Sequence, residues 1–470
     1  MTALDAARRR LPGPAGRGWR TAGWAAVAVL LAVGVRRALA DPLSAPVPTR
    51  ANAVLTAGQD FRDATYFPVK ELVSGGDPYD PAPMFAHWPV NQEFDLYAPL
   101  HLVLHLPFAA LPYRAALLLF SCLALAALVG IGLVSARVMR LPGGWLAAWL
   151  VAGLVVLSQI GKSAISIGQI NPVVGLGAVL ALTQAGRSRI SVSTRRPASA
   201  GLTRSAGVGS WASGFGSVSV WGSVGLALAW TKPQFAIPIA VLLLARGAWR
   251  QVVLGTGLAF VVSLPVVAVL VARAGGIGGF LDVVQRNLSY ATHTRYAAVD
   301  SPTGSRVDLA AVFYRLTGWL PPGAELAALV LVLGLAAWLV GSSVAGRSQV
   351  GRSAAGSVFD VPELFLVSLA CLVCIAHQQG ESLLTVPALV GAAAAWVRRE
   401  RVSRWLWPVA ALTLVPALRV SAVQSFTAAH LGVQTDRLVE GVCLVLAFAG
   451  SCLLVHDRRF AQKSAAKVVV

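Results

Sequence analysis

Two carboxylates and a guanidinium lie close together near the start of the chain, in the segment Asp60-Phe61-Arg62-Asp63. Carboxylates take up protons in general acid–base catalysis, and a guanidinium pairs with a carboxylate or binds a phosphate. The same residue types also occur in ordinary solvated, charged loops. The chemical role of this segment therefore depends on which other polar groups the fold brings to the same place.

Further polar side chains interrupt apolar runs later in the chain. They are the amides Gln169 and Asn171, Lys232 next to Pro233, and His377. A lysine in an apolar run either extends to the membrane surface or binds an anion, and amides either cap a helix or bond to sugar hydroxyls. A lone histidine at a helix end is either held by a local hydrogen bond or contacts a phosphate or a sugar.

The composition is that of a membrane protein. Hydrophobic residues make up 56% of the 470 residues and charged residues 13%, against about 25% charged residues in soluble domains. Several runs, such as 115–136, 252–272 and 326–344, approach the roughly 20 apolar residues of a spanning helix. We predict an all-α polytopic membrane protein with about twelve transmembrane helices, inserted in the cell (plasma) membrane as a multi-pass protein.

The charge distribution predicts the orientation. The formal net charge is +19, and the basic residues form short clusters between apolar runs, as the positive-inside rule expects of cytoplasmic loops. We therefore expect membrane lipids as partners and no nucleic acid. With a cytoplasmic N-terminus, the first long loop lies outside, and acidic residues outnumber basic ones there. We expect no cofactor, while dependence on a metal ion stays open.

The alternation of apolar and charged segments predicts the domain organisation. In order, we expect a cytoplasmic basic N-terminus (1–20), a first transmembrane helix (21–40), an outer loop with an interfacial helix that carries the acidic motif (41–113), transmembrane helices (114–185), a flexible cytoplasmic linker (186–216), transmembrane helices (217–273), an outer loop (274–322), transmembrane helices (323–456) and a cytoplasmic tail (457–470). The first helix also resembles a signal peptide. Arg36 and Arg37 directly precede its Ala-Leu-Ala site and disfavour cleavage, so we expect the helix to be retained.

Two apolar runs are too long for a single crossing. The run 145–182 is interrupted at 161–163 and at 168–172, and the run 218–244 is interrupted at 230–234, where Pro233 lacks the N–H of a helix interior. We predict that each run forms two short helices that meet at the outer face. This topology gathers a set of polar residues at the outer membrane interface: Asp60, Asp63, Gln169, Asn171, Lys232, His377 and Glu381. Polar groups at membrane depth are costly and usually functional.

The order and spacing of these pieces resemble glycosyltransferase family 87, a GT-C-fold family of polyprenyl-phosphate-mannose-dependent mannosyltransferases. The matching pieces are Asp60-Phe61 after the first helix, Gly75-Gly76-Asp77-Pro78-Tyr79, Gly168-Gln169-Ile170-Asn171, the Lys232-Pro233 hinge followed by Arg246 and Trp249-Arg250, and His377 in a late outer turn. The resemblance extends from about residue 24 to residue 397.

The resemblance implies a GT-C-like bundle with a long first outer loop. It also implies an inverting transfer, on the extracytoplasmic side, of a sugar (mannose) from a polyprenyl-phosphate donor to a glycolipid or glycan acceptor. Asp60 matches the family's loop aspartate and is the expected general base, and Asp63 is the alternative base or an orienting group.

Further roles follow for the remaining candidates. The leaving lipid phosphate needs cations or N–H donors, for which Lys232, His377 and Arg62 are the candidates. The candidates for sugar or acceptor binding are Gln169, Asn171, Tyr79, His101 and His105. The last two share one helix face but lack the glutamate of an HExxH motif, so we prefer an interfacial or acceptor-contacting role over metal binding.

The main alternative is a transporter or flippase for a lipid or lipid-linked sugar. Broken helices suit transporters, but transporters usually carry internal repeats and polar groups in the middle of the membrane. The sequence has no evident repeat, and its polar groups gather at one interface. We therefore favour the transferase over the flippase and over a non-catalytic assembly subunit.

Overall fold

The computed structural model describes residues 14–91, 97–184, 219–293, 298–300, 306–347, 359–377, 379–418, 426, 429–430 and 432–468. Over these residues the chain is predominantly helical and forms no β-strand. The predicted linker 186–216 and most of the basic N-terminus lie outside the described residues. The structure confirms the predicted class, an all-α polytopic membrane protein.

Six helical segments are long and apolar enough to cross a membrane. They lie in α2 (Pro14–Ser44), α7 (Tyr113–Val138), α13 (Trp249–Arg273), α16 (Ala324–Arg347), η5 with α18 (Gln379–Thr385 and Val386–Val397) and α21 (Val433–Val468). The pair α8 (Gly144–Leu157) and α9 (Gln159–Ile167), bent by 55°, is a seventh candidate span.

Shorter apolar helices complete the bundle. They are α10 (Asn171–Thr183), α11 (Val220–Ala229), α12 (Pro233–Ala245), α17 (Val361–Cys374) and α19 (Leu406–Leu418). Each has fewer than the roughly 20 residues of a full crossing, so the figure of about twelve crossings stays a prediction.

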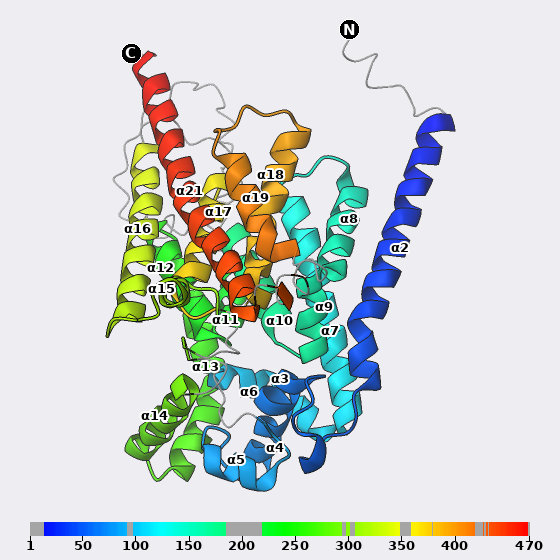
Figure 1. Ribbon diagram of the computed structural model, residues 1–470, viewed down its shortest axis with the longest axis vertical. Coiled ribbons are helices and arrows are strands. Elements are labelled where there is room, and N and C mark those ends of the chain that lie inside the picture. Colours follow the sequence, from blue (N-terminus) through cyan, green and yellow to red (C-terminus); the bar gives the residue numbers. More distant parts are fainter. Residues whose placement is uncertain are drawn as a thin grey trace, which may run out of the picture.

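Helix α17 lies at the centre of the bundle. Every residue from Glu363 to Cys374 is buried, as expected of a helix that is apolar all round. It packs against α12, α16, α18 and α21. In contrast, α2 and α13 leave most of their apolar surface exposed, which suits helices that face lipid. Figure 1 shows α2 along one side of the bundle.

A cap of short helices covers one end of the bundle (Figure 1). After η1 (Arg50–Asn52), it contains α3 (Gln59–Phe61), the π-helix η2 (Arg62–Tyr66), α4 (Phe67–Val73), α5 (Pro81–His87), α6 (Pro99–His105), the 3-10 helix η3 (Leu106–Ala110) and α14 (Ile277–His293). Helix α15 (Leu309–Thr317) precedes α16. The interfacial helix predicted between the first two transmembrane helices corresponds to α6 and η3.

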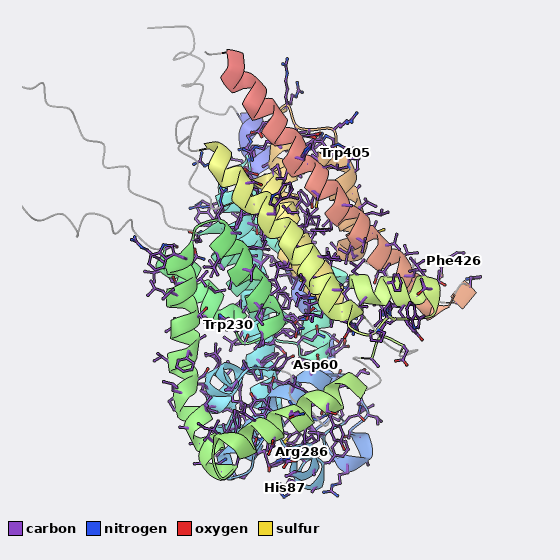
Figure 2. The ribbon with its side chains drawn as sticks, turned by 90° about the vertical axis from the view of Figure 1, so that its left-hand side faces the viewer. Asp60, His87, Trp230, Arg286, Trp405 and Phe426 are labelled. Carbon is purple, nitrogen blue, oxygen red and sulfur yellow. The ribbon has the colours of Figure 1, made fainter. Side chains whose placement is uncertain are left out.

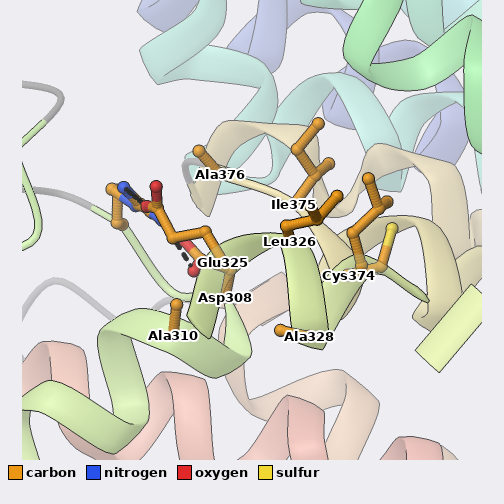
Figure 3. Close-up of a pocket in the computed structure, with 10 residues that line it drawn as sticks. Asp308, Ala310, Glu325, Leu326, Ala328, Cys374, Ile375 and Ala376 are labelled. Carbon is orange, nitrogen blue, oxygen red and sulfur yellow. Dashed lines mark hydrogen bonds and ion pairs between the residues drawn. The ribbon is translucent and has the colours of Figure 1, made fainter. Parts of the chain in front are cut away.

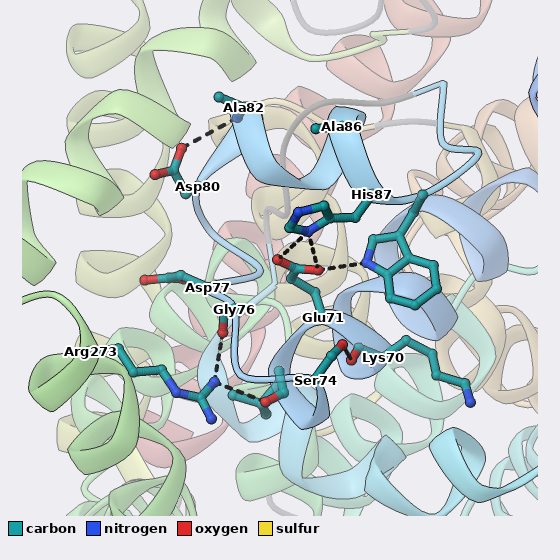
Figure 4. Close-up of polar contacts among 12 residues, drawn as sticks. Lys70, Glu71, Ser74, Gly76, Asp77, Asp80, Ala82, Ala86, His87 and Arg273 are labelled. Atoms are coloured by element: carbon teal, nitrogen blue, oxygen red, sulfur yellow. Dashed lines mark hydrogen bonds and ion pairs between the residues drawn. The ribbon is translucent and has the colours of Figure 1, made fainter.

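Polar contacts hold the cap together (Figure 4). The buried carboxylate of Glu71 lies 3.1 Å from His87 Nδ1 and accepts a hydrogen bond of 2.6 Å from Trp88 Nε1. Arg273, the last residue of α13, donates to the carbonyl oxygens of Leu72 and Gly76 at 2.9 and 2.6 Å. The acidic loop is therefore a packed structure joined to the bundle, and not a solvated loop.

Two of the three breaks predicted in the long apolar runs lie where the sequence places them. Pro233 begins α12 after the break that follows α11, and the chain between α9 and α10 turns at Gly168. The third break, predicted at residues 161–163, is at Ser158 instead. The Ser158 hydroxyl accepts a hydrogen bond from the Gly161 N–H at 3.0 Å and so caps α9. Lys162 consequently lies inside α9.

Candidate active site

Two glycines bring Asp60 to its position. Gly58, with a φ of 65°, precedes α3 and donates its N–H to a carbonyl oxygen of α9 at 2.8 Å. Gly168 has a φ of 80°, and a Cβ there would lie 2.5 Å from Phe61 Cβ. Glycine alone combines this conformation with this close approach. The turn that carries Gln169 therefore packs directly against the turn that carries Asp60.

A continuous series of polar contacts joins Asp60 to Lys232. The Gln169 side chain is hydrogen-bonded to Asp60, and Gln169 Oε1 accepts from Asn171 Nδ2 at 2.9 Å. Asn171 Oδ1 accepts in turn from Lys232 Nζ at 2.7 Å. Two amides thus link a carboxylate and an ammonium that come from distant parts of the sequence.

On its other side, Lys232 pairs with Glu381. Lys232 Nζ lies 2.7 Å from Glu381 Oε1, and Glu381 Oε2 lies 3.6 Å from His377 Nε2. Gly380 permits this approach, because a Cβ there would lie 2.9 Å from Gln169 Oε1. The structure therefore brings the predicted Asp60, Gln169, Asn171, Lys232 and His377 into one connected cluster.

Glu381 completes this cluster, although the sequence-based prediction gave it no role beyond its place among the outer polar groups. It is 2% exposed. A carboxylate in an apolar run needs a counter-ion, and both Lys162 and Lys232 interrupt apolar runs of the sequence. That reasoning gives two candidate partners for Glu381, and the packing of the turns selects Lys232.

Asp60 differs from Asp63 in its access to solvent. Asp60 is half-buried, whereas Asp63 is 1% exposed. Burial raises the pKa of Asp60, and the charge of Lys232, the hydrogen bond from Gln169 and the charge of Arg62 oppose this shift. The protonation of Asp60 therefore depends on the balance between its burial and the neighbouring cations and amide.

Asp63 and Arg62 form a buried ion pair. Arg62 Nε and Nη2 donate to the two carboxylate oxygens of Asp63 at 2.6 and 2.9 Å, and Arg62 Nη1 donates to the Leu55 carbonyl oxygen at 3.2 Å. Burial raises the pKa of Asp63 to about 6, although Arg62 acts in the opposite direction. The two side chains therefore bind mainly each other, with the Leu55 carbonyl oxygen as a further acceptor for Arg62.

The other acceptor-binding candidates lie in packed surroundings. Tyr79 donates its hydroxyl to the Tyr97 carbonyl oxygen at 2.8 Å. His101 Nε2 donates to the Ala64 carbonyl oxygen at 2.9 Å, and His105 Nδ1 donates to the His101 carbonyl oxygen at 2.7 Å. The three side chains are buried. Lys232 Nζ lies 5.5 Å from the centre of the Tyr97 ring, which packs against the His101 ring at 4.5 Å, so the cap borders the polar cluster through Tyr97.

A pocket of about 200 Å³ is lined by Cys374, Ile375 and Ala376, which directly precede His377 in the chain (Figure 3). Its walls are largely apolar and include Leu326 and Ile375, while the ion pair of Arg306 with Asp308 lies at its polar side. The Val307 N–H donates to the His377 carbonyl oxygen at 3.0 Å, which joins the segment of the ion pair to the residue that follows the pocket lining.

Metal binding has no clear location in the part of the chain that the structure describes. No three histidine, cysteine or carboxylate side chains form a group there that could hold a metal ion.

These features define a helical membrane protein with a buried carboxylate, amide, lysine and histidine site at one end of its bundle. A sequence model described as Glycosyltransferase family 87 matches residues 96–368, which is more than half of the chain. The chain belongs to glycosyltransferase family 87, and the protein is a membrane glycosyltransferase with a sugar donor and an acceptor as its substrates. Neither the comparison with curated proteins nor that with solved structures gave a match.

The matched range includes part of the site. Gln169, Asn171 and Lys232 lie inside it, whereas Asp60 precedes it and His377 follows it. The structure joins all five residues, so the site extends beyond the matched range at both ends.

Proposed function

We propose that the protein is a GT-C-type inverting mannosyltransferase that takes mannose from a polyprenyl-phosphate donor and transfers it to a glycolipid or glycan acceptor. The observation that carries this proposal is the series of contacts from Asp60 through Gln169 and Asn171 to Lys232. This series links the proposed base to the proposed phosphate-binding cation, and in this proposal the sugar–phosphate bond lies next to both.

Asp60 is the general base in this proposal. The acceptor hydroxyl oxygen attacks the anomeric carbon as its proton passes to the Asp60 carboxylate. A bond from the acceptor oxygen to the anomeric carbon forms, and the bond from that carbon to the phosphate oxygen breaks. The phosphate leaves with the electron pair as a stable anion, so no general acid is required.

Lys232 and His377 stabilise the negative charge that develops on the phosphate. An ammonium group has three N–H donors, of which Asn171 and Glu381 take two, and the third is directed to a phosphate oxygen. Buried His377 Nε2 has no hydrogen-bond partner among the described residues. His377 Nδ1 already donates to the Ile375 carbonyl oxygen at 2.9 Å, so Nε2 supplies a second donor in the imidazolium form of the ring, 3.6 Å from the Glu381 carboxylate. Donors fixed in advance at the developing charge are the usual means of stabilising such a transition state.

The amides have a positioning role next to the sugar. Gln169 and Asn171 fix the distance between the base and the cation, and the sugar hydroxyls lie against the same two side chains. Arg62 and Asp63 support the turn of Asp60, because their polar groups already bind each other.

The pocket lined by Ile375 and Ala376 suits the hydrocarbon part of the donor. Its residues Leu326 and Leu329 belong to the first turns of the candidate span Ala324–Ser343, where the helix enters the membrane. A lipid chain that leaves the phosphate near His377 can pass along this apolar wall into the bilayer.

The distribution of basic residues supports an extracytoplasmic site. Clusters of arginine lie at the helix ends far from Asp60, as in the segment 398–404 after α18 and at Arg458 in α21. By the positive-inside rule, that end faces the cytoplasm and the Asp60 end faces outward in the cell membrane.

A transfer assay tests the proposal. The purified full-length protein in detergent, given polyprenyl-phosphate mannose and a glycolipid acceptor, is expected to release polyprenyl phosphate and to mannosylate the acceptor. Asp60→Asn is expected to lose at least about 100-fold in kcat, the usual contribution of a general base. The exposed Asp282→Asn in α14 makes the same chemical change away from the site and should keep its activity.

Two outcomes would contradict the proposal. Normal turnover by Asp60→Asn would show that Asp60 is not the general base. Translocation of a labelled lipid-linked sugar across vesicles, without transfer, would favour a flippase.

A further inference from the structure

A second and larger pocket lies at the end of the bundle opposite to Asp60. It has a volume of about 700 Å³ and lies between the start of α17, the turn that follows α18, and α21. Val361, Val402 and Leu454 contribute apolar walls, and arginines lie at its rim. In Figure 2, Trp405 of this turn lies near one end of the molecule, well separated from Asp60.

The pocket lies at the boundary between membrane and water. Two candidate spans end beside it, Gly380–Val397 and Thr435–Arg458. Trp396 and Trp407, which flank the turn, are 69% and 41% exposed. Exposed tryptophans at the ends of spanning helices are typical of the interfacial belt, where lipid headgroups begin.

Among the described residues, the charges around the pocket leave two arginines without an ion pair. Asp360 pairs with Arg458, and Glu400 pairs with Arg398 at 2.8 Å. Asp457, the third acidic residue of the lining, accepts a hydrogen bond from the Ser403 hydroxyl at 3.1 Å.

For Arg401 and Arg404, both exposed, the described part of the chain contains no ion pair. The Arg404 guanidinium lies 5.4 Å from the centre of the Trp405 ring. The two guanidinium groups are therefore available to an anion at the mouth of an apolar pocket.

We propose that this pocket binds an anionic phospholipid of the leaflet opposite to the Asp60 site. Arg401 and Arg404 hold the headgroup phosphate, to which guanidinium groups donate pairs of hydrogen bonds. An acyl chain lies against Val361 and Leu454. Guanidinium groups at the membrane–water boundary bind anionic headgroups in this way, and the volume is that of a ligand site. The proposal does not depend on the transfer reaction.

Retention of lipid by the full-length protein tests this proposal. The protein is extracted in detergent with equal amounts of phosphatidylglycerol and phosphatidylcholine of matched chains, and native mass spectrometry counts the lipids that stay bound. We expect preferential retention of phosphatidylglycerol. The double variant Arg401→Gln/Arg404→Gln is expected to lose on the order of tenfold in this retention, as two arginines near an anionic headgroup predict.

Two further variants make the result specific. Arg399→Gln removes the same charge from an exposed position of the same turn that does not line the pocket, and should retain phosphatidylglycerol. Val402→Trp fills the apolar wall without changing the charge, and should lose the lipid. This second variant also decides the question if the double arginine variant does not fold.

Three results would overturn the proposal. They are equal retention of the two lipids by the unaltered protein, equal loss of phosphatidylglycerol in Arg399→Gln and in the double variant, and displacement of the lipid by inorganic phosphate alone, which would indicate a site for free anions.

Discussion

Lys232 Nζ and Glu381 Oε1 lie 2.7 Å apart although 149 residues separate them in the sequence. Their side chains are 10% and 1% exposed. Removing one partner of such a pair leaves the other charge buried without compensation. Because Lys232 also donates to Asn171, the ion pair fixes the ammonium in relation to Asp60.

The first prediction concerns this ion pair. Glu381→Gln leaves the buried ammonium of Lys232 without its counter-charge and is expected to destabilise the protein by about 3 kcal/mol. A thermal unfolding experiment in detergent measures the loss. The double variant Lys232→Met/Glu381→Gln removes both charges and should regain part of the stability. If the two single losses simply add in the double variant, the pair is not coupled.

The second prediction concerns the pH dependence of the reaction. A general base acts only when it is ionised, so kcat/KM should rise as the pH increases through the pKa of Asp60. Burial raises that pKa, and the charge of Lys232 lowers it. Lys232→Met removes the opposing charge, so the pKa rises further and the acid limb of the profile should move to higher pH. An acid limb that stays in place or moves to lower pH would contradict the assignment of Asp60.

The third prediction separates the two aspartates. Asp63→Asn breaks the buried pair with Arg62 and should cost about 3 kcal/mol of stability. The folded fraction should keep most of its kcat, whereas Asp60→Asn should keep the stability and lose the kcat. Thermal unfolding and the transfer assay on the same preparations compare the two. An active Asp60→Asn with an inactive but folded Asp63→Asn would make Asp63 the base.

The fourth prediction concerns the turn before Gln169. Gly168→Ala places a Cβ 2.5 Å from Phe61 Cβ at a φ of 80°, and should cost about 1–3 kcal/mol and reduce kcat, because Gln169 moves away from Asp60. Gly257→Ala in α13 is the matched control, since nothing lies within 4 Å of its Cβ. Its stability should stay equal or increase. Equal effects of the two substitutions would exclude a specific contact.

Much of this site could be predicted from the sequence, because a membrane limits where polar groups can lie. Lys232 next to Pro233 requires a break in an apolar run, and the structure has it there. The same reasoning brought Gln169, Asn171 and His377 to the face of Asp60. These predictions rest on the cost of polar groups in hydrocarbon, which acts on each segment separately.

The remainder depends on packing between segments that are distant in sequence. The α8–α9 break at Ser158 arises because a hydroxyl caps a helix, and the Gly-Lys-Ser segment at 161–163 does not indicate this position. Arg62 and Asp63 pair with each other because the cap buries both side chains. The charged sequence of the loop does not indicate this burial. The role of Glu381 depends on a contact with Lys232 that neither local sequence encodes.

A structure of the full-length protein with a non-hydrolysable polyprenyl-phosphate mannose analogue tests the central claim most directly. We predict that the phosphate lies about 3 Å from Lys232 Nζ and His377 Nε2, with the anomeric carbon facing the Asp60 carboxylate. A phosphate bound elsewhere, with Asp60 and Lys232 both away from the sugar, would contradict the account.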